Sequence, residues 1–490
     1  MGSFYAYPAF QAKYGQPLAD GTVGLTAAWQ AGLSNGVNVG EILGLFVNGI
    51  VSERYGYRKT MIVSLIATIA FIFINFFAQN VQTLLVGEIL IGIPLGVFQT
   101  LTVTYASEVC PVVLRAYLTT YVNLCWVIGQ FIASGKILGG PFEYWLNVSG
   151  VLRALLQRSD QWAYRIPFAI QWIWPIPIII GVYLAPESPW WLVRKGRTEE
   201  AARSLRRLTE STDTTFDAQQ TVAMMVYTNE LEREIQEGTA YWDCFKGIDL
   251  RRTEVVCIVW AAQNLCGAGL MGYSTYFYTQ AGLSTEGAFD LALAQYAIGM
   301  IGTIFSWVLM TYFGRRTLYL GGLTFLFIFL MIVGFIAIGH QNNATAWATG
   351  SMLLVYTFFY DSSVGPVCYS LVAEISSTRL RTKSIVLARN LYNIFSIVNG
   401  VIIPYMLNPE AWNWRGKAGF FWGALCFCCV VWTFFRLPEP KGRTFGELDV
   451  LFERGTSARK FSSTTVDVFE THVNEKDAAL YGEENKGFEA

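Results

Sequence analysis

Long apolar stretches recur along nearly the whole of this 490-residue chain. About 18 apolar residues are enough to cross the hydrocarbon core of a bilayer as a helix. Helices are favoured there because they satisfy their own backbone hydrogen bonds without water. The chain is therefore predicted to be an all-α membrane protein. Eleven stretches fit, at residues 26–51, 61–79, 83–106, 116–138, 166–185, 254–280, 288–311, 317–338, 348–372, 384–407 and 417–437.

The composition excludes several other classes of protein. Charged residues make up 14% of the chain, against about 25% in soluble globular domains. A soluble enzyme of this length would need more charge on its surface. The 35 basic and 36 acidic residues nearly cancel, so no net positive field favours nucleic acid. The lipid bilayer is the expected surrounding, and a monomer is the expected state.

The cysteines predict neither a metal site nor a disulfide. Most of the nine lie in apolar runs, where cysteine acts as a small buried hydrophobe. Cys426, Cys428 and Cys429 are close together but have no histidine beside them. No cofactor is expected either, and the chain lacks the Gly-x-x-x-x-Gly-Lys-Ser/Thr phosphate loop of ATP-driven transporters.

Lysine and arginine predict which side of the membrane each connector faces. One set of connectors, which includes residues 194–252 and the C-terminal tail, is rich in these residues, and the opposite set has few. The rich set is expected in the cytoplasm, because cytoplasmic loops carry an excess of positive charge. Both glycosylation sequons, at Asn147 and Asn343, fall in connectors assigned to the outside.

One long polar segment, from Pro186 to Arg252, divides the spans into two groups. Within it an amphipathic helix with an N-terminal cap at Thr198 is expected over Thr198–Leu208. The predicted organisation is an N-terminal bundle, a cytoplasmic linker, a C-terminal bundle and a cytoplasmic tail, at residues 1–185, 186–253, 254–437 and 438–490.

The two groups of spans repeat each other. Each has a glycine before basic residues, a glutamate seven residues before an arginine, and a Pro-Glu pair after its last span. A parallel duplication of about six helices follows, with the first helix largely missing ahead of residue 10. The paired residues are Gly56 and Gly314, Glu108 and Glu374, Arg115 and Arg381, and Glu187 and Glu439.

These repeated charges form a candidate cytoplasmic gate. Ion pairs at helix ends can hold two halves together on one side and separate when the halves rock. Ordinary charges of cytoplasmic loops are the alternative, which the duplicated spacing disfavours. The candidate gate residues are Gly56, Arg58, Glu108, Arg115, Gly314, Arg315, Glu374 and Arg381.

Two charged residues stand deep within predicted spans. Glu41 is one, and a charge at membrane depth costs about 2.5–3.5 kcal/mol. Arg389 is the only arginine so placed. A proton-binding glutamate and an arginine that tunes it suffice for proton coupling, and a purely structural pair is the alternative. Asp361 is a weaker candidate, and Glu88 is placed near the outer interface, where a charge is cheap.

Amides, hydroxyls and aromatic rings within the spans predict a polar cavity. A sugar presents many hydroxyls and a few apolar CH faces, which such side chains can bind. Hydrogen bonds between helices are the alternative use of these residues. The candidate substrate-binding residues are Asn123, Gln130, Gln263, Asn264, Tyr273, Tyr369 and Asn393, with Tyr276 and Tyr392 near them.

Several strings of residues resemble the sugar porter family of the major facilitator superfamily, and most closely its fungal maltose (α-glucoside) permeases. They include Tyr-Ala-Ser-Glu-Val-Cys-Pro at residues 105–111 and Pro-Glu-Ser-Pro-Trp-Trp-Leu-Val at 186–193. The resemblance covers residues 5–469. It implies the major facilitator fold, two six-helix bundles with alternating access. It also implies that the candidate amides contact sugar and that Glu41 and Arg389 serve proton symport.

The chain departs from the family pattern in three places. The acidic stretch of the family's first helix is missing, and Tyr57 stands directly after Gly56 where many members have arginine. In the second half, residues 310–312 lack the acidic residue expected before Gly314.

The predicted function is import of maltose-like α-glucosides across the plasma membrane by proton symport, with sugar and proton as partners and no enzymatic activity. A facilitator without proton coupling is one alternative. A sugar sensor that signals through the 438–490 tail without transport is the other.

Overall fold

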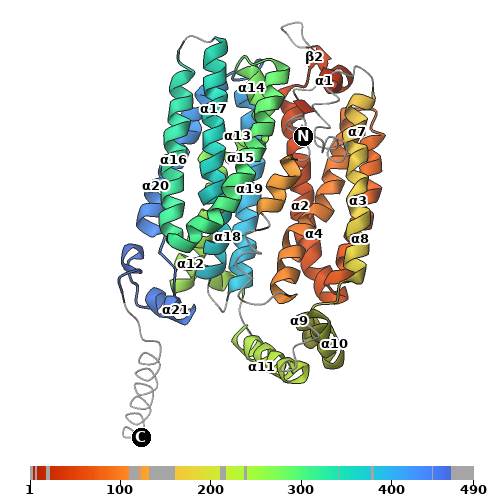
Figure 1. The fold of residues 1–490 in the computed structure, drawn as a ribbon, viewed down its shortest axis with the longest axis vertical. Helices are drawn as coiled ribbons and strands as arrows, with labels where there is room; N and C mark the ends of the chain where they lie inside the picture. Colours follow the sequence, from red (N-terminus) through yellow and green to blue (C-terminus); the bar gives the residue numbers. More distant parts are fainter. Residues whose placement is uncertain are drawn as a thin grey trace, which may run out of the picture.

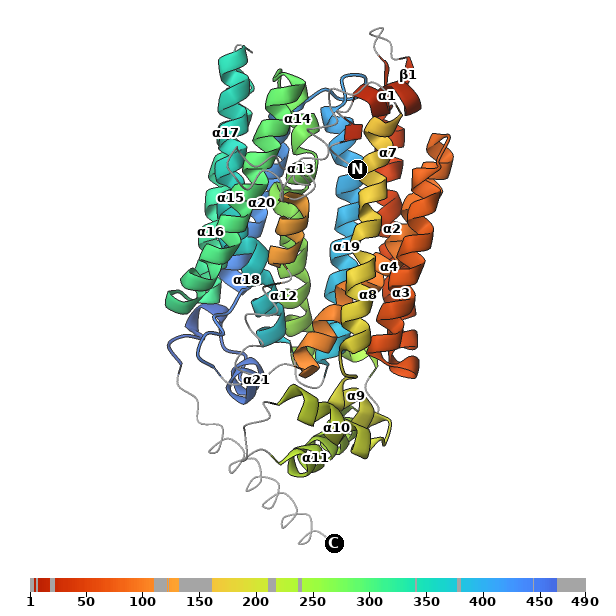
Figure 2. The same cartoon turned by 45° about the vertical axis from the view of Figure 1, so that its right-hand side comes forward.

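Two helical bundles stand side by side, and short helices cover one end (Figures 1 and 2). The end that carries α9 (Pro189–Arg194), α10 (Thr198–Leu208) and α11 (Ala218–Gln236) is called the linker end. The opposite end carries α1 (Pro8–Tyr14) and is called the α1 end. This computed structural model describes residues 4–5, 8–17, 23–109, 121, 123–131, 161–209, 217–236, 240–339, 342–376, 380–443 and 445–464.

The first bundle is held together by a close crossing of two long helices. A Cβ atom on Gly40 would lie 2.0 Å from the Ile89 carbonyl oxygen, and one on Gly96 would lie 2.2 Å from that of Glu41. Small residues allow this approach of two backbones, and it places Glu41 against the neighbouring helix. The elements are α2 (Ala27–Tyr55), α3 (Tyr57–Phe76), α4 (Val81–Val109), α7 (Trp162–Ile170), η2 (Gln171–Ile173) and α8 (Pro175–Leu184).

The second bundle contains two spans that are interrupted by short π-helices. These are η4 (Asn264–Ala268), between α12 (Gly247–Gln263) and α13 (Gly269–Gly272), and η5 (Tyr360–Val364), between α17 (Asn343–Phe359) and α18 (Gly365–Ile375). Gly267 has a φ of +90°, which a residue with a side chain would adopt only under strain. The other elements are α14 (Ser274–Gln280), α15 (Thr285–Tyr312), α16 (Arg315–Ile336), α19 (Arg381–Leu407), η6 (Arg415–Lys417) and α20 (Ala418–Arg436).

The predicted all-α membrane architecture is confirmed. Within the described part of the chain, eight helical segments are long and apolar enough to cross a bilayer. The predicted spans at 26–51 and 348–372 are helical but are not among the eight. The first carries Glu41 and several amides, and the second carries Asp361, Ser362 and Ser363 in η5. In the predicted span 116–138, residues 123–131 are helical and most of the others lie outside the described residues.

The linker helix α10 has the predicted bounds, but the predicted cap at Thr198 is wrong. The cap position is Arg197, whose side chain makes no capping hydrogen bond, and Thr198 is already the first helical residue. Tyr241–Phe245 then forms η3 before α12. Asn343 is exposed where α17 begins at the α1 end (Figure 1), whereas Asn147 lies outside the described residues.

Two small elements complete the ends of the molecule. At the α1 end, β1 (Gln16–Pro17) and β2 (Val23–Gly24) pair antiparallel. At the linker end, α21 (Phe445–Glu453) is followed by η7 (Ala458–Lys460). Buried Arg252 forms an ion pair with Asp449 of α21 and donates to the Ile375 carbonyl at 3.0 Å. The described first part of the predicted tail is therefore packed against the second bundle.

Candidate functional site

A polar cavity of about 270 Å³ lies between the two bundles. Four elements line it: α2 and α4 from the first bundle, and the η4–α13 segment and α19 from the second. Its polar lining residues are Ser34, Asn38, Glu88, Asn264, Tyr273, Ser396 and Asn399. Hydroxyls and amides from both bundles thus face one space, which suits a ligand with many hydroxyls.

Asn264 lies where the broken helix meets α19. Its amide donates to the Tyr392 carbonyl and to the Ser396 hydroxyl, each at 3.1 Å. Asn399 in turn donates to the Asn264 backbone carbonyl at 3.0 Å. The neighbouring helix α19 therefore supplies a hydrogen-bond donor to the first backbone carbonyl of the π-helix η4. The predicted candidate lines the cavity and also joins two helices.

Of three other predicted residues, Gln263 and Asn393 are buried and Tyr369 is half-buried. Gln263 donates to the Gly365 carbonyl at 2.9 Å, so its amide joins α12 to α18. Tyr369 packs edge-on against Trp260, with ring centres 5.3 Å apart. Asn393 is 1% exposed, and neither atom of its amide has a hydrogen-bond partner among the described residues. An unsatisfied buried amide is costly, and a polar ligand could satisfy it.

Asn123 brings the first bundle against the interrupted helix α17–η5–α18. Its amide lies 3.4 Å from the Thr303 hydroxyl and 3.5 Å from an Asp361 carboxylate oxygen. Asp361 is buried, and a Cβ atom on Gly299 would lie 2.6 Å from its other oxygen. Gln130, the predicted partner on the Asn123 helix face, is exposed. The structure therefore brings together Asn123 and Asp361, which the sequence had weighed separately.

An amide links the buried Glu41 to the half-buried Arg389. Arg389 donates twice to the Gln99 side-chain oxygen, at 3.1 and 2.6 Å, and lies over the rings of Trp260 and Tyr392. Glu41 is 8% exposed and interacts electrostatically with Arg389, but the guanidinium makes its hydrogen bonds to Gln99. Because Arg389 donates its hydrogen bonds to the neutral Gln99, Glu41 can change its protonation state without breaking a hydrogen-bonded ion pair.

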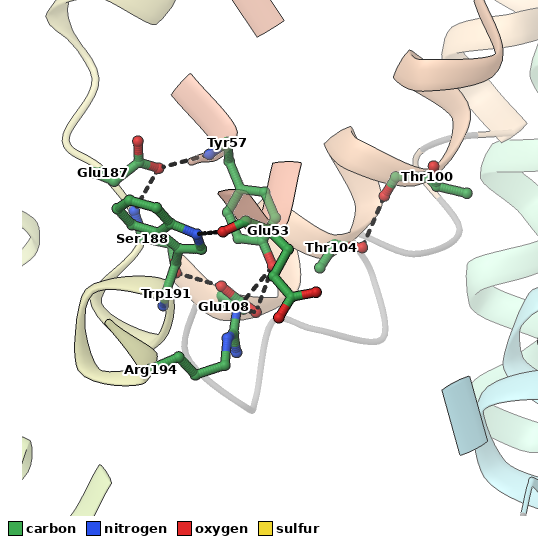
Figure 3. A network of polar contacts seen from close by, with 9 residues as sticks. All are labelled: Glu53, Tyr57, Thr100, Thr104, Glu108, Glu187, Ser188, Trp191 and Arg194. Atoms are coloured by element: carbon green, nitrogen blue, oxygen red, sulfur yellow. Dashed lines mark hydrogen bonds and ion pairs between the residues drawn. The ribbon is translucent and has the colours of Figure 1, made fainter. Parts of the chain in front are cut away.

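A second polar group surrounds Glu187 at the linker end (Figure 3). Its carboxylate accepts hydrogen bonds from the backbone N–H groups of Tyr57 (3.2 Å) and Arg58 (3.3 Å), where α3 begins. These N–H groups have no partner inside the helix, so an anion is favoured there. Burial raises the pKa of Glu187, although these N–H donors act in the opposite direction. A Cβ atom on Gly56 would lie 2.7 Å from this carboxylate, which explains the glycine.

Glu108 forms the other centre of the same network (Figure 3). It accepts hydrogen bonds from Arg194 at 2.9 Å, from the Tyr57 hydroxyl at 3.1 Å and from the Ser188 hydroxyl. The Trp191 indole donates to the Glu53 carbonyl at 3.0 Å. Helix α9 is thus attached to the ends of α2, α3 and α4.

The second bundle repeats the arrangement around Glu439. This carboxylate accepts from the backbone N–H groups of Arg315 (2.8 Å) and Arg316 (3.1 Å), where α16 begins. A Cβ atom on Gly314 would lie 2.0 Å from it. The Arg315 side chain then pairs with Glu374 at 3.3 Å. The predicted duplication is therefore also a duplication of contacts.

The predicted gate pairs have different described partners. Glu108 pairs with Arg194 and Glu374 with Arg315, so each of these pairs stays within one half or between a half and the linker. Arg115 and the Arg381 side chain lie outside the described residues, and their proposed pairs stay a prediction. In this arrangement the described pairs brace each half rather than join the two.

Several residues of the site were missed from the sequence. Gln99, Ser34, Asn38 and Asn399 are polar residues in largely apolar stretches, and their spacing does not show which face of the helix they occupy. Arg194 belongs to a linker with many basic residues, and the sequence does not indicate which of them forms an ion pair with Glu108. Glu88 was seen but placed at the outer interface, whereas it is buried at the cavity wall. Among the described residues, no group of three His, Cys, Asp or Glu side chains could hold a metal.

The comparisons with other proteins agree with this geometry. Residues 1–452 match the family model "Sugar (and other) transporter". Maltose permease MAL61 of Saccharomyces cerevisiae is 44% identical over 473 residues, which are 96% of this chain and 75% of the permease. Alpha-glucosides permease MPH3 of the same species is 43% identical over 484 residues, which are 98% of this chain and 78% of the permease.

Solved structures share the fold at lower identity. The proton:xylose symporter XylE bound to 6-bromo-6-deoxy-D-glucose matches with a TM-score of 0.70 and 20% identity, over 92% of this chain and 96% of the symporter. The partially occluded inward-open form of XylE from E. coli matches with a TM-score of 0.68 and 20% identity, over 90% of this chain and 97% of XylE.

The fold and the cavity between two bundles therefore define a multi-pass membrane protein of the major facilitator superfamily. Within it, the chain belongs to the Sugar (and other) transporter family.

Proposed function

We propose that this protein imports maltose-like α-glucosides across the plasma membrane by proton symport. The cavity between the bundles is the observation that carries the proposal, because amides, hydroxyls and one carboxylate from four elements line it and sugars are bound by such groups. The relatives named as maltose and α-glucoside permeases support the choice of sugar. The linker end faces the cytosol in this proposal, and the cavity fills from the α1 side.

The way in which the two halves are built supports alternating access. Each half is braced at the linker end by its own carboxylate, Glu187 or Glu439, so each can move as a unit. The two halves meet along α2 and α19, where a Cβ atom on Gly400 would lie 2.3 Å from the Asn35 side-chain oxygen. Rocking about such contacts exposes a central site to one side at a time.

Glu41 carries the proton in this proposal, and Arg389 sets its affinity for the proton. The glutamate is buried between α2 and α4, and the guanidinium is held nearby by Gln99. A proton taken up from the outside neutralises Glu41 and makes movement through the apolar interior cheaper. Release on the cytosolic side then couples the proton to the sugar.

Uptake of labelled maltose by cells that lack their own maltose carriers tests the proposal. We expect accumulation above the outside concentration, alkalinisation of the medium when maltose is added, and loss of both with an uncoupler. Glu41→Gln should abolish accumulation and keep maltose exchange. Uptake without any pH change and without sensitivity to uncoupler would establish a facilitator instead. An absence of maltose uptake by correctly localised protein would reject the proposal.

A further inference from the structure

Glu88 is a buried carboxylate that the proton mechanism does not use. It is 7% exposed and is the charged member of the described residues that line the cavity. Counted along α4, it lies eleven residues before Gln99, which is roughly 16 Å at 1.5 Å per residue. The carboxylate is therefore far from the Arg389 group and needs a separate explanation.

A hydrogen bond from Asn75 orients the Glu88 carboxylate. The Asn75 amide donates to Glu88 Oε1 at 2.8 Å, and Asn75 is itself 2% exposed. A Cβ atom on Gly87 would lie 1.7 Å from the Asn75 side-chain oxygen, so the glycine lets the asparagine approach. This bond fixes one oxygen of the carboxylate at the cavity wall. An ionised carboxylate can accept about four hydrogen bonds, so it can accept bonds from sugar hydroxyls in addition to the one from Asn75.

Glu88 and Asn264 lie at different depths on the cavity wall. Asn264 hydrogen-bonds to Ser396 of α19. The Cβ atom of Glu88 lies 3.4 Å from a Cβ placed on Gly36 of α2. The residue before Gly36, Asn35, contacts Gly400 of α19. Gly400 is four residues beyond Ser396 along α19. The Cβ atom of Glu88 is therefore about one helical turn, roughly 5–6 Å, nearer the α1 end than the contact between Asn264 and Ser396. A pyranose ring with its hydroxyls is also roughly 6 Å across, given C–C bonds of about 1.5 Å.

We propose that Glu88 forms a second sugar subsite, which binds the outer ring of a disaccharide while the inner ring lies at Asn264. The carboxylate accepts hydrogen bonds from two neighbouring hydroxyls of the outer ring, and Asn75 keeps it oriented. Such bonds to an ionised acceptor are stronger than neutral ones. The subsite rests on the proposed function and makes Glu88 a determinant of preference for two-ring over one-ring α-glucosides.

Transport of two sugars that differ by one ring tests the subsite. Maltose has both rings, and methyl α-glucoside has one. For Glu88→Ala we expect the KM for maltose to rise about tenfold or more, because a hydrogen bond to a charged group is lost. The KM for methyl α-glucoside should change less than twofold, and the maximal rate for either sugar should stay within twofold. Glu88→Gln should give a smaller rise for maltose, because it keeps one acceptor oxygen and the volume of the side chain.

The controls separate this subsite from other roles of Glu88. Glu286→Gln changes an exposed carboxylate at the start of α15 and should leave both KM values unchanged. Transport rates are divided by the amount of protein at the cell surface. If Glu88→Ala does not fold, the KM values of Glu88→Gln test the subsite instead. Equal rises for both sugars, no change for either, or lost accumulation with unchanged KM values would overturn the subsite. A wild-type protein that moves neither sugar would instead reject the proposed function.

Discussion

The linker ends of the two halves use the same carboxylates but different cations. In both halves a glutamate of a Pro-Glu pair, Glu187 or Glu439, accepts from the first N–H groups of a helix. In the second half Arg315, at the start of that helix, also pairs with Glu374. In the first half Tyr57 occupies the corresponding place, and the cation comes from Arg194 in α9.

This difference follows from one residue and changes how the linker is used. A tyrosine hydroxyl can donate a hydrogen bond to Glu108 but cannot neutralise it. The Glu108 side chain is 14% exposed, and a carboxylate so far removed from water is costly without a cation, so the first half takes its cation from outside the bundle. Helix α9 becomes a structural part of the first half, whereas the corresponding centre of the second half is complete within the bundle.

The largest loss of stability is expected from replacing the equivalent carboxylates of the two halves, Glu187 and Glu439. Glu187→Ala or Glu439→Ala should each lower the free energy of unfolding by about 2–4 kcal/mol, because two backbone N–H groups lose their acceptor. Thermal unfolding of the purified protein in detergent measures this. Glu200→Ala, which breaks a largely exposed pair with Arg197 at the start of α10, is the control and should cost less than about 0.5 kcal/mol. Clearly unequal losses at Glu187 and Glu439 would contradict the equivalence of the two sites.

A smaller effect is expected from Arg194→Ala, at about 1–3 kcal/mol, because Glu108 loses its cation. The sharper test is the double variant Tyr57→Arg with Arg194→Ala. It copies the second half and should recover most of the lost unfolding temperature. If the added arginine gives no recovery, Tyr57 is not the reason that the first half uses Arg194.

The smallest effect is expected from Tyr57→Phe, at about 0.5–1.5 kcal/mol, because only the hydroxyl contacts to Glu108 and Arg194 are lost. Limited proteolysis of the linker is a sensitive measure, and faster cleavage near α9 is expected. The matched control is Tyr227→Phe, since Tyr227 is 69% exposed on α11. A loss as large as that of Arg194→Ala would show that the hydroxyl, and not the cation, holds α9.

Much of the fold could be predicted because bilayer physics acts on composition and length. Most of the apolar stretches, the bounds of the amphipathic helix α10 and the duplicated Gly and Pro-Glu positions could be predicted from the sequence, whereas most of the predicted span 116–138 lies outside the described residues. The gate partners could not. The interval from Glu108 to Arg115 repeats at Glu374 and Arg381, but sequence spacing does not show that Arg194 or Arg315 comes closer in space.

The cavity shows the same division. The amides of Asn264 and Asn393 stand out in apolar runs, and the structure buries both. Gln99, Asn75 and Glu88 matter because of what they contact, and each contact joins helices whose mutual rotation the pattern leaves open. Gly87 has no visible role until Asn75 is placed beside it.

The amino-acid sequence alone determined that the chain lies in a membrane, that its helices form two repeated groups, and which rare polar residues they carry, because the cost of exposing polar groups to lipid depends on the residue and its depth. Only the tertiary structure decided which of these groups meet. Helix rotation and close glycine crossings set the distance between side chains far apart in the chain, and hydrogen bonds form only within about 3 Å.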